Sequence, residues 1–392
     1  MKLITNNLFK SHSEILHGSF RKIIFYLFLI FLLIFLTISS TVTYAVPDLI
    51  EATKNNNYER VKQLLHEGVN PGIRSDSNPT ALHWSALNGD TRITKLLLNR
   101  GSNPNILFES RPHLSEHSKW EGYFLKPESP LHLAIWNENF EIIKILLEHG
   151  ANPNLKNKDG ETPLYAASWE GNLSIVKLLL HHGADPAIRT ERCIGRGCHY
   201  AGQFAPLHRA AQFDRKKILE VLIKNSADPN AKTQSGLTPL YIAAKARNFK
   251  VLKILLNNGA QAGLHSALFP VVENGPKKFV RFLLKNGASP NKQNNHGWTS
   301  MHLASYMGNN SILKVLLKNG GKPNIRAENG QTPLHKAAER ANSKTVKILV
   351  NNGAKLSIKD DFGESPLKKA KVYGKAHNDP TGNDTTIRVL KS

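Results

Sequence analysis

The two cysteines of the chain are the residues whose types and spacing most directly suggest chemistry. Cys193 and Cys198 flank the segment Ile-Gly-Arg-Gly, whose two glycines allow a tight loop. In an oxidising compartment such a pair predicts a disulfide. The alternative is a zinc site, although the C-x4-C spacing is a weak zinc signal. Its ligands would be two thiolates and two imidazoles, from Cys193, Cys198, His199 and either His181 or His182. We expect the disulfide, and neither a metal nor a cofactor.

Histidine is frequent enough, at 17 residues, to raise the question of acid–base catalysis. Five histidines occupy the fourth position of a recurring Thr-Pro-Leu-His-like turn: His83, His132, His208, His302 and His335. A fixed place in a recurring turn indicates a structural role. The sequence also contains no phosphate-binding glycine loop, no H-E-x-x-H pair and no G-x-S-x-G nucleophile turn. We therefore predict that the protein is not an enzyme.

The elements that position these residues come from an internal repeat. A leucine or methionine that follows a Thr-Pro-like pair recurs along the chain, at Leu49, Leu82, Leu131, Leu164, Leu207, Leu240, Leu268, Met301, Leu334 and Leu367. Six of the nine intervals are 33 residues, and the other three are 49, 43 and 28. A hydroxyl N-cap, usually followed by proline, predicts the start of a first helix in each repeat; the caps are Thr80, Ser129, Thr162, Thr238, Ser266, Thr299, Thr332 and Ser365. A Leu-Leu-x-x-Gly segment predicts the end of a second helix.

This pattern resembles the ankyrin repeat, as in Thr332-Pro333-Leu334-His335 followed by Ile348-Leu349-Val350-Asn351-Asn352-Gly353-Ala354. The resemblance covers residues 47–392 with about ten units. It implies an all-α solenoid of helix-turn-helix units joined by β-turn or hairpin fingers. The apolar run near the N-terminus predicts one hydrophobic helix before the solenoid. The resemblance also implies a protein-binding scaffold without catalysis, in which the recurring histidine is a local hydrogen-bonding strut.

The array, which we assign to residues 46–392, departs from the 33-residue pattern at defined places. Insertions fall at about 106–127 and 187–203, the second of which contains both cysteines. An irregular joint is expected at 261–276, where five residues are missing and Pro270 falls inside a first helix. Ser226 stands where other units carry the glycine that ends the second helix. Residues 362–392 are expected to form a C-terminal capping repeat.

Residues 1–45 form a segment of a different kind. A nearly unbroken apolar run at 23–38 follows Arg21 and Lys22, and small residues at Thr43 and Ala45 suit cleavage after Ala45. We expect a signal peptide, which would make the array periplasmic or secreted. The alternative is a signal anchor, which would give a single-pass membrane protein with the array outside.

Charge is distributed unevenly along the array. The chain carries 52 basic and 30 acidic residues, and residues 235–392 alone hold 25 basic and 8 acidic ones. A solvated lysine-rich face is one explanation of the excess; an anionic partner or surface is the other. The candidate anion-facing residues are Lys277, Lys278, Arg281 and Lys285.

A second candidate surface is the position that follows the alanine pair of each first helix, which in ankyrin arrays lines the concave groove. Large or aromatic residues recur there, and Trp and Tyr are frequent interface anchors. The candidate partner-binding residues are Leu87, Trp136, Trp169, Gln212 and Tyr306. The alternative is that the inserted segments cover these side chains.

We therefore expect an exported, noncatalytic scaffold that binds a protein partner through the concave ankyrin surface; the basic excess would favour an acidic partner. The first alternative is a membrane-tethered adaptor with its basic face against anionic lipid or another polyanion. The second is an enzyme or metal site at the Cys193/Cys198 insertion. A nucleic acid partner is not expected.

Overall fold

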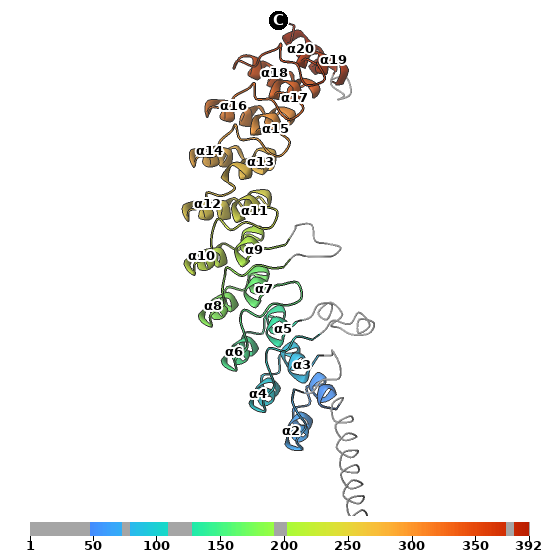
Figure 1. Cartoon of the computed structure of the whole chain (residues 1–392), viewed down its shortest axis with the longest axis vertical. Helices are drawn as coiled ribbons and strands as arrows, with labels where there is room; N and C mark the ends of the chain where they lie inside the picture. The colour runs from blue at the N-terminus through green and yellow to red at the C-terminus, as the bar shows by residue number, and fades with distance from the viewer. Residues whose placement is uncertain (1–47, 73–78, 109–127, 192–201, 374–379, 392) are drawn as a thin grey trace, which may run out of the picture. The chain divides into compact units, whose positions relative to one another are not determined.

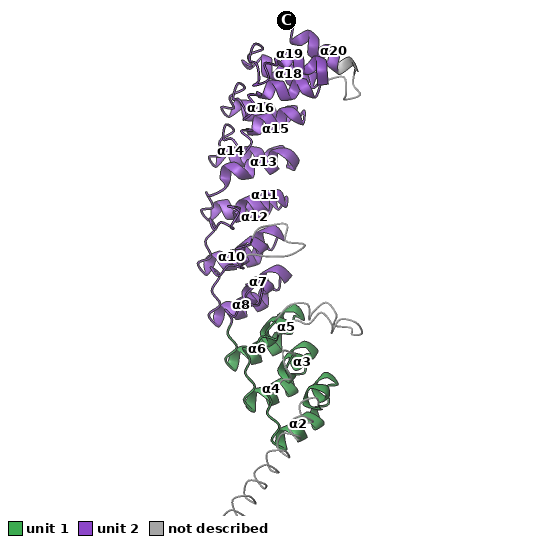
Figure 2. Cartoon of the chain, turned by 45° about the vertical axis from the view of Figure 1, so that its right-hand side comes forward, with its two compact units in different colours: residues 1–152 green, residues 153–392 purple. Residues whose placement is uncertain are grey.

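The computed structural model describes residues 48–72, 79–108, 128–191, 202–373 and 380–391, shown in colour in Figure 1. These residues form helices joined by turns, with no β-strand among them. The chain divides into two compact units, residues 1–152 and 153–392 (Figure 2). The apolar segment expected at 1–45 lies outside the described residues, as do Cys193 and Cys198. No helix in the described part is both long and apolar enough to cross a bilayer.

In unit 1 the described helices pack as pairs. They are α2 (Tyr58–His66), α3 (Ala81–Asn88), α4 (Thr91–Asn99), α5 (Pro130–Trp136) and α6 (Phe140–Glu148), after a helical stretch at 48–54. The first helices α3 and α5 contact each other, and so do the second helices α4 and α6. Phe108, at the base of the 106–127 insertion, is 1 % exposed and packs with Leu87 and Leu133.

In unit 2 first and second helices alternate along the chain. The first helices are α7 (Pro163–Glu170), α9 (Pro206–Gln212), α11 (Pro239–Lys245), α13 (Leu264–Asn274), α15 (Ser300–Tyr306), α17 (Pro333–Glu339) and α19 (Pro366–Tyr373). The second helices are α8 (Leu173–His181), α10 (Lys216–Lys224), α12 (Phe249–Asn257), α14 (Lys277–Lys285), α16 (Asn310–Lys318), α18 (Ser343–Val350) and α20 (Pro380–Val389). Each first helix packs on the next, which buries the apolar faces that one pair alone would leave exposed.

The pair α7 and α8 shows why the sequence folds this way. The Thr162 side chain accepts a hydrogen bond from the Tyr165 N–H at 3.3 Å, and Pro163 occupies the first helical position. Gly171, at φ +95°, ends α7 in the left-handed conformation. The caps predicted at Ser129, Thr238 and Thr299 also accept a bond from a backbone N–H.

The recurring histidines are buried struts between adjacent repeats. In α15 the Thr299 N–H donates to His302 Nδ1 at 3.0 Å, so the Nε2 of this ring carries the proton. Nε2 then donates to the Gln331 carbonyl at 3.0 Å, 29 residues along the chain. His208 makes the same two contacts, with the Ala205 N–H and the Ala231 carbonyl. These bonds confirm that His208 and His302 occupy structural positions.

Asparagines in the turns add a second link between repeats. In unit 2 the Asn324 amide donates to the Gly353 carbonyl at 2.8 Å, and its oxygen accepts from the Lys355 N–H at 2.8 Å. Asn230 and Asn291 bond in the same way to the repeat that follows each of them. The glycine carbonyl just after α12, α16 and α18 is therefore satisfied by a side chain of the preceding repeat.

The segment 261–276 is organised differently from its neighbours. The expectation that Ser266 caps the first helix is wrong, because α13 begins at Leu264, after Gly263 in the left-handed conformation (φ +74°). The helix has 11 residues and contains Pro270. The first helices α11 and α13 pack extensively, whereas α12 and α14 meet through stacked Phe249 and Phe279 rings, with centroids 4.2 Å apart.

Candidate functional site

The first-helix side of unit 2 carries a cluster of aromatic rings around one arginine. We call it the Arg209 cluster: Tyr165 and Trp169 on α7, Phe204 just before α9, and Arg209, Gln212 and Phe213 on or directly after α9. Its residues come from two successive repeats and from the end of the 187–203 insertion. Phe204 is fixed there by two hydrogen bonds to Thr190: its carbonyl accepts from the Thr190 N–H at 2.9 Å, and its N–H donates to the Thr190 hydroxyl oxygen at 2.9 Å.

Arg209 is the centre of this cluster. Its guanidinium carbon lies 4.3 Å from the Trp169 ring centroid, 5.0 Å from that of Phe204 and 5.2 Å from that of Tyr165. These are distances at which a cation is attracted to the face of an aromatic ring. Arg209 also donates to the Tyr165 hydroxyl from Nε and to the Gln212 side-chain oxygen at 2.7 Å. The guanidinium is thereby held in one orientation.

The outer edge of the cluster is a stack of two rings. Trp169 and Phe213 lie nearly parallel, at an interplanar angle of 13°, with centroids 5.9 Å apart. Phe213 is 38 % exposed and Trp169 is half-buried, whereas Tyr165 beneath them is 2 % exposed. Burial raises the pKa of Tyr165 to about 12, so its phenol stays protonated at physiological pH. The cluster therefore offers a rigid aromatic surface backed by a neutral hydroxyl.

A hollow of about 240 Å³ adjoins the cluster on the side of α11. Its lining is mostly apolar or aromatic and consists of Phe204, Gln212, Leu237, Tyr241, Ile242, Lys245 and Ala246. Phe204 and Gln212 belong to both the hollow and the Arg209 cluster. The two features thus form one continuous surface, which could receive an apolar side chain of a partner beside the aromatic stack.

The structure distributes the five predicted partner-binding residues over several environments. Trp169 and Gln212 meet in the Arg209 cluster. Tyr306, on α15, instead lies in a second group, with the Trp298 ring at 5.8 Å and the Arg340 guanidinium at 4.7 Å. Trp136 is half-buried at the end of α5 in unit 1.

The expectation that Leu87 is exposed is wrong. Its side chain is only 2 % exposed, because Phe108 from the base of the first insertion packs against it. Leu87 is therefore part of the core of unit 1.

Sequence reasoning missed Tyr165, Phe204, Arg209 and Phe213. A signal was present, because Tyr165 and Tyr241 stand where other repeats have the strut histidine. The imidazole of a strut histidine accepts from the cap N–H and donates to a carbonyl of the next repeat, as His302 does. A tyrosine at this position cannot make both bonds, and the Tyr165 hydroxyl instead accepts from Arg209. Tyr165 and Tyr241 lie on the helices before and after α9.

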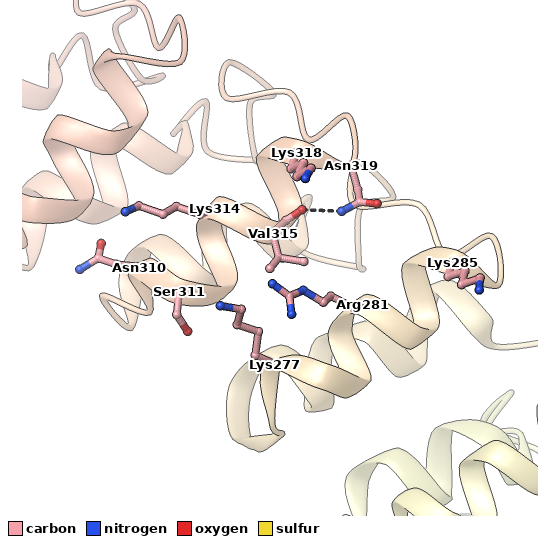
Figure 3. Close-up of a pocket in the computed structure, with 9 residues that line it drawn as sticks. All are labelled: Lys277, Arg281, Lys285, Asn310, Ser311, Lys314, Val315, Lys318 and Asn319. Carbon is pink, nitrogen blue, oxygen red and sulfur yellow. Dashed lines mark hydrogen bonds between the residues drawn. The ribbon is translucent and has the colours of Figure 1, made fainter.

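Three of the four predicted anion-facing residues come together on the second-helix side. Lys277, Arg281 and Lys285 line a hollow of about 850 Å³ between α14 and α16, shown in Figure 3. The opposite wall contributes Lys314 and Lys318. Lys278 does not line this hollow, because successive residues of a helix point in different directions; its ammonium lies 5.4 Å from the Phe279 ring centroid.

The predicted disulfide and its zinc alternative concern Cys193 and Cys198, which fall outside the described residues. Among the residues that the structure does describe, no group of three or more His, Cys, Asp or Glu side chains is arranged to hold a metal ion.

Two kinds of comparison with known proteins agree. A family model that describes three consecutive ankyrin repeats matches the chain in five stretches: residues 49–155, 107–190, 196–266, 263–327 and 301–377. An ankyrin repeat protein of Fowlpox virus (strain NVSL) is 29 % identical over 127 residues, which are 31 % of this chain and 86 % of the viral protein.

Proposed function

Because the chain belongs to the ankyrin-repeat family, whose repeats mediate protein–protein interactions, we propose that it is a noncatalytic scaffold that binds a protein partner at the Arg209 cluster and the adjoining hollow. This surface lies on the first-helix side of unit 2, the side that the family resemblance assigns to the concave groove. The partner would place an apolar side chain in the hollow and cover the Trp169–Phe213 stack.

The observation that carries this proposal is the fixed position of Arg209 among three aromatic rings. Trp, Tyr and Arg are the residue types that contribute most to binding energy at protein interfaces. Ordering a long side chain on binding costs about 0.5–1.5 kcal/mol, and here the ring contacts and the bond to Gln212 already order Arg209. The exposed edge at Phe213 leaves the aromatic stack accessible to a partner.

Stability alone gives a weaker account of this cluster. The repeats that carry His302 and His335 stack through buried histidine struts. The repeat that carries Tyr165 instead uses a tyrosine whose hydroxyl meets Arg209. The cluster also leaves Phe213 38 % exposed beside a mostly apolar hollow, and an exposed apolar surface of this kind suits an interaction site.

We also propose that residues 1–45 export the array from the cytoplasm. The support is the apolar run at 23–38 with basic residues before it and the small residues at Thr43 and Ala45 after it. The array would then meet its partner outside the cytoplasm, where Cys193 and Cys198 would be oxidised.

The proposal is tested by comparing which proteins bind residues 46–392 with and without the aromatic stack. Proteins captured by the wild type are identified by mass spectrometry and compared with those captured by Phe213→Ala. Phe362→Ala is the matched control, because Phe362 is an exposed phenylalanine of the same unit, at 74 %. A partner that Phe362→Ala retains and Phe213→Ala loses supports the proposal; capture that is equal for both variants contradicts it.

A further inference from the structure

The hollow between α14 and α16 is a basic groove that the Arg209 cluster does not use. One wall presents Lys277, Arg281 and Lys285, and the other presents Lys314 and Lys318. In Figure 3 the ammonium of Lys277 and the guanidinium of Arg281 extend from α14 toward α16. The rest of the lining is polar or neutral, and we call this hollow the basic groove.

The cations of the basic groove are spaced one helical turn apart. Lys277, Arg281 and Lys285 are separated by four residues each, which is about 6 Å per step and about 12 Å in all along the helix. Lys314 and Lys318 repeat this spacing on α16. The positive charge is therefore distributed along a line and does not converge on one point. A compact anion would need several donors aimed at one position, so the ligand is expected to carry repeated charges.

The positive charge of the groove is not balanced by the helices around it. The sequences of α12, α14, α16 and α18 contain lysines and arginine but no acidic residue, whereas the second helices α6 and α10 contain glutamate. Within the described part of the chain, none of the five groove cations is in an ion pair. Like charges so arranged repel one another and lower stability, which an anionic ligand would reverse.

The lining also separates classes of anionic ligand. Single-stranded nucleic acid is bound by aromatic side chains on which bases stack, and no aromatic residue lines the basic groove. All five groove cations are exposed, so a lipid surface is the competing ligand, and the spacing of the charges decides between the two. An acidic protein segment fits better. Carboxylates on alternate residues of an extended chain are about 7 Å apart, close to the 6 Å step of the cations.

We propose that the basic groove is a second binding site, which takes an acidic segment of a partner protein laid along α14 and α16. Its carboxylates would pair with the row Lys277, Arg281 and Lys285, and Lys314 and Lys318 would close the other side. The site lies on second helices and is independent of the proposed function of the Arg209 cluster.

The test uses a fluorescein-labelled poly-glutamate peptide as the probe and fluorescence anisotropy as the measurement. The test variant is the triple change Lys277→Gln, Arg281→Gln and Lys314→Gln. The matched control removes three exposed lysines of the same unit outside the groove: Lys217→Gln, Lys232→Gln and Lys355→Gln. Each exposed ion pair is worth about two- to threefold in affinity, so the groove variant, which loses three of them, should bind about tenfold more weakly. The control should lose much less, and the groove variant should unfold at the same or a higher temperature than the wild type.

Three results would overturn the proposal. One is an equal loss of affinity for poly-glutamate in the groove variant and in the control, because binding would then depend on net charge alone. Another is binding of an oligo-dT strand, of tripolyphosphate or of phosphatidylserine vesicles that exceeds binding of poly-glutamate and is lost in the groove variant. The third is absence of poly-glutamate binding at low salt. Phe213→Ala should bind the peptide normally, so failure here is distinguishable from failure of the Arg209 cluster.

Discussion

Acidification from pH 7 to pH 5 should destabilise the array through its strut histidines, and His302→Gln should remove part of that effect. Burial is the main cause that lowers the pKa of His302 to about 4, and the same cause lowers the pKa of His208 to about 4. The nearby charge of Lys336 also lowers the pKa of His302. Protonation of His302 would also place a hydrogen on Nδ1. That nitrogen accepts from the Thr299 N–H in the folded state, so this hydrogen bond would be lost.

The sign and size follow from proton linkage. Between pH 6.5 and pH 4 the unfolded chain binds a proton at His302 that the folded chain does not bind, so stability falls as the pH is lowered through this range. Each pH unit is worth about 1.4 kcal/mol, which gives a loss of about 2 kcal/mol for this histidine at pH 5. Asp360, whose folded pKa is about 2, starts from an ordinary value of 3.8 and changes little above pH 5.

The assay is urea denaturation of the wild type and His302→Gln at pH 7 and pH 5, followed by circular dichroism. The wild type should lose more stability than the variant on acidification, by about 2 kcal/mol. The variant itself should be less stable at pH 7, because glutamine cannot replace both imidazole bonds. Equal losses for the two proteins would refute the argument that His302 is held neutral in the fold.

Three further predictions concern separate parts of the chain. Ser226 adopts the left-handed conformation, at φ +69°, just after its second helix. Ser226→Gly should therefore stabilise the array by up to about 1 kcal/mol in urea denaturation, and an unchanged stability would contradict the idea that serine is strained there. Hydrogen exchange should be faster in α12 and α14 than in the second helices of the other interior repeats, because these two helices have few contacts with each other beyond the Phe249–Phe279 stack; uniform protection of the second helices would count against a weak joint. Intact-mass measurement of exported protein should give a chain that begins at Val46 with an oxidised Cys193–Cys198 pair, whereas retention of residues 1–45 would indicate an anchor and two free thiols would exclude the disulfide.

Local features of the fold were predictable because each is encoded within a few residues. Thr299 and His302 are three positions apart, and the cap bond between them follows from that spacing. Ser226 was identified by alignment with the glycines of other repeats, and its positive φ confirms the assignment. Three of the four predicted anion-facing residues likewise share one wall of the basic groove because they repeat at helical spacing.

Features that depend on contacts between repeats were not predictable in the same way. Leu87 was expected on an exposed row, but its burial is set by Phe108, which comes from an insertion without a counterpart in other repeats. Arg209 could not be identified because its partners come from two repeats and from Phe204 at the end of the second insertion. The repeat spacing showed that the connection before α13 is short, but alignment with the regular repeats placed the cap at Ser266 and did not show that the helix begins at Leu264.

The central claim, that the protein binds a partner through the Arg209 cluster, is tested most directly by the affinity of a purified partner for single variants. Isothermal titration should show that Phe213→Ala and Arg209→Ala each weaken binding about 30-fold, as expected when a residue at the centre of an interface is truncated. Phe362→Ala should leave affinity unchanged, and circular dichroism should show that all three variants keep the wild-type helical content. Wild-type affinity in folded Phe213→Ala and Arg209→Ala would contradict the claim and place the partner elsewhere on the array.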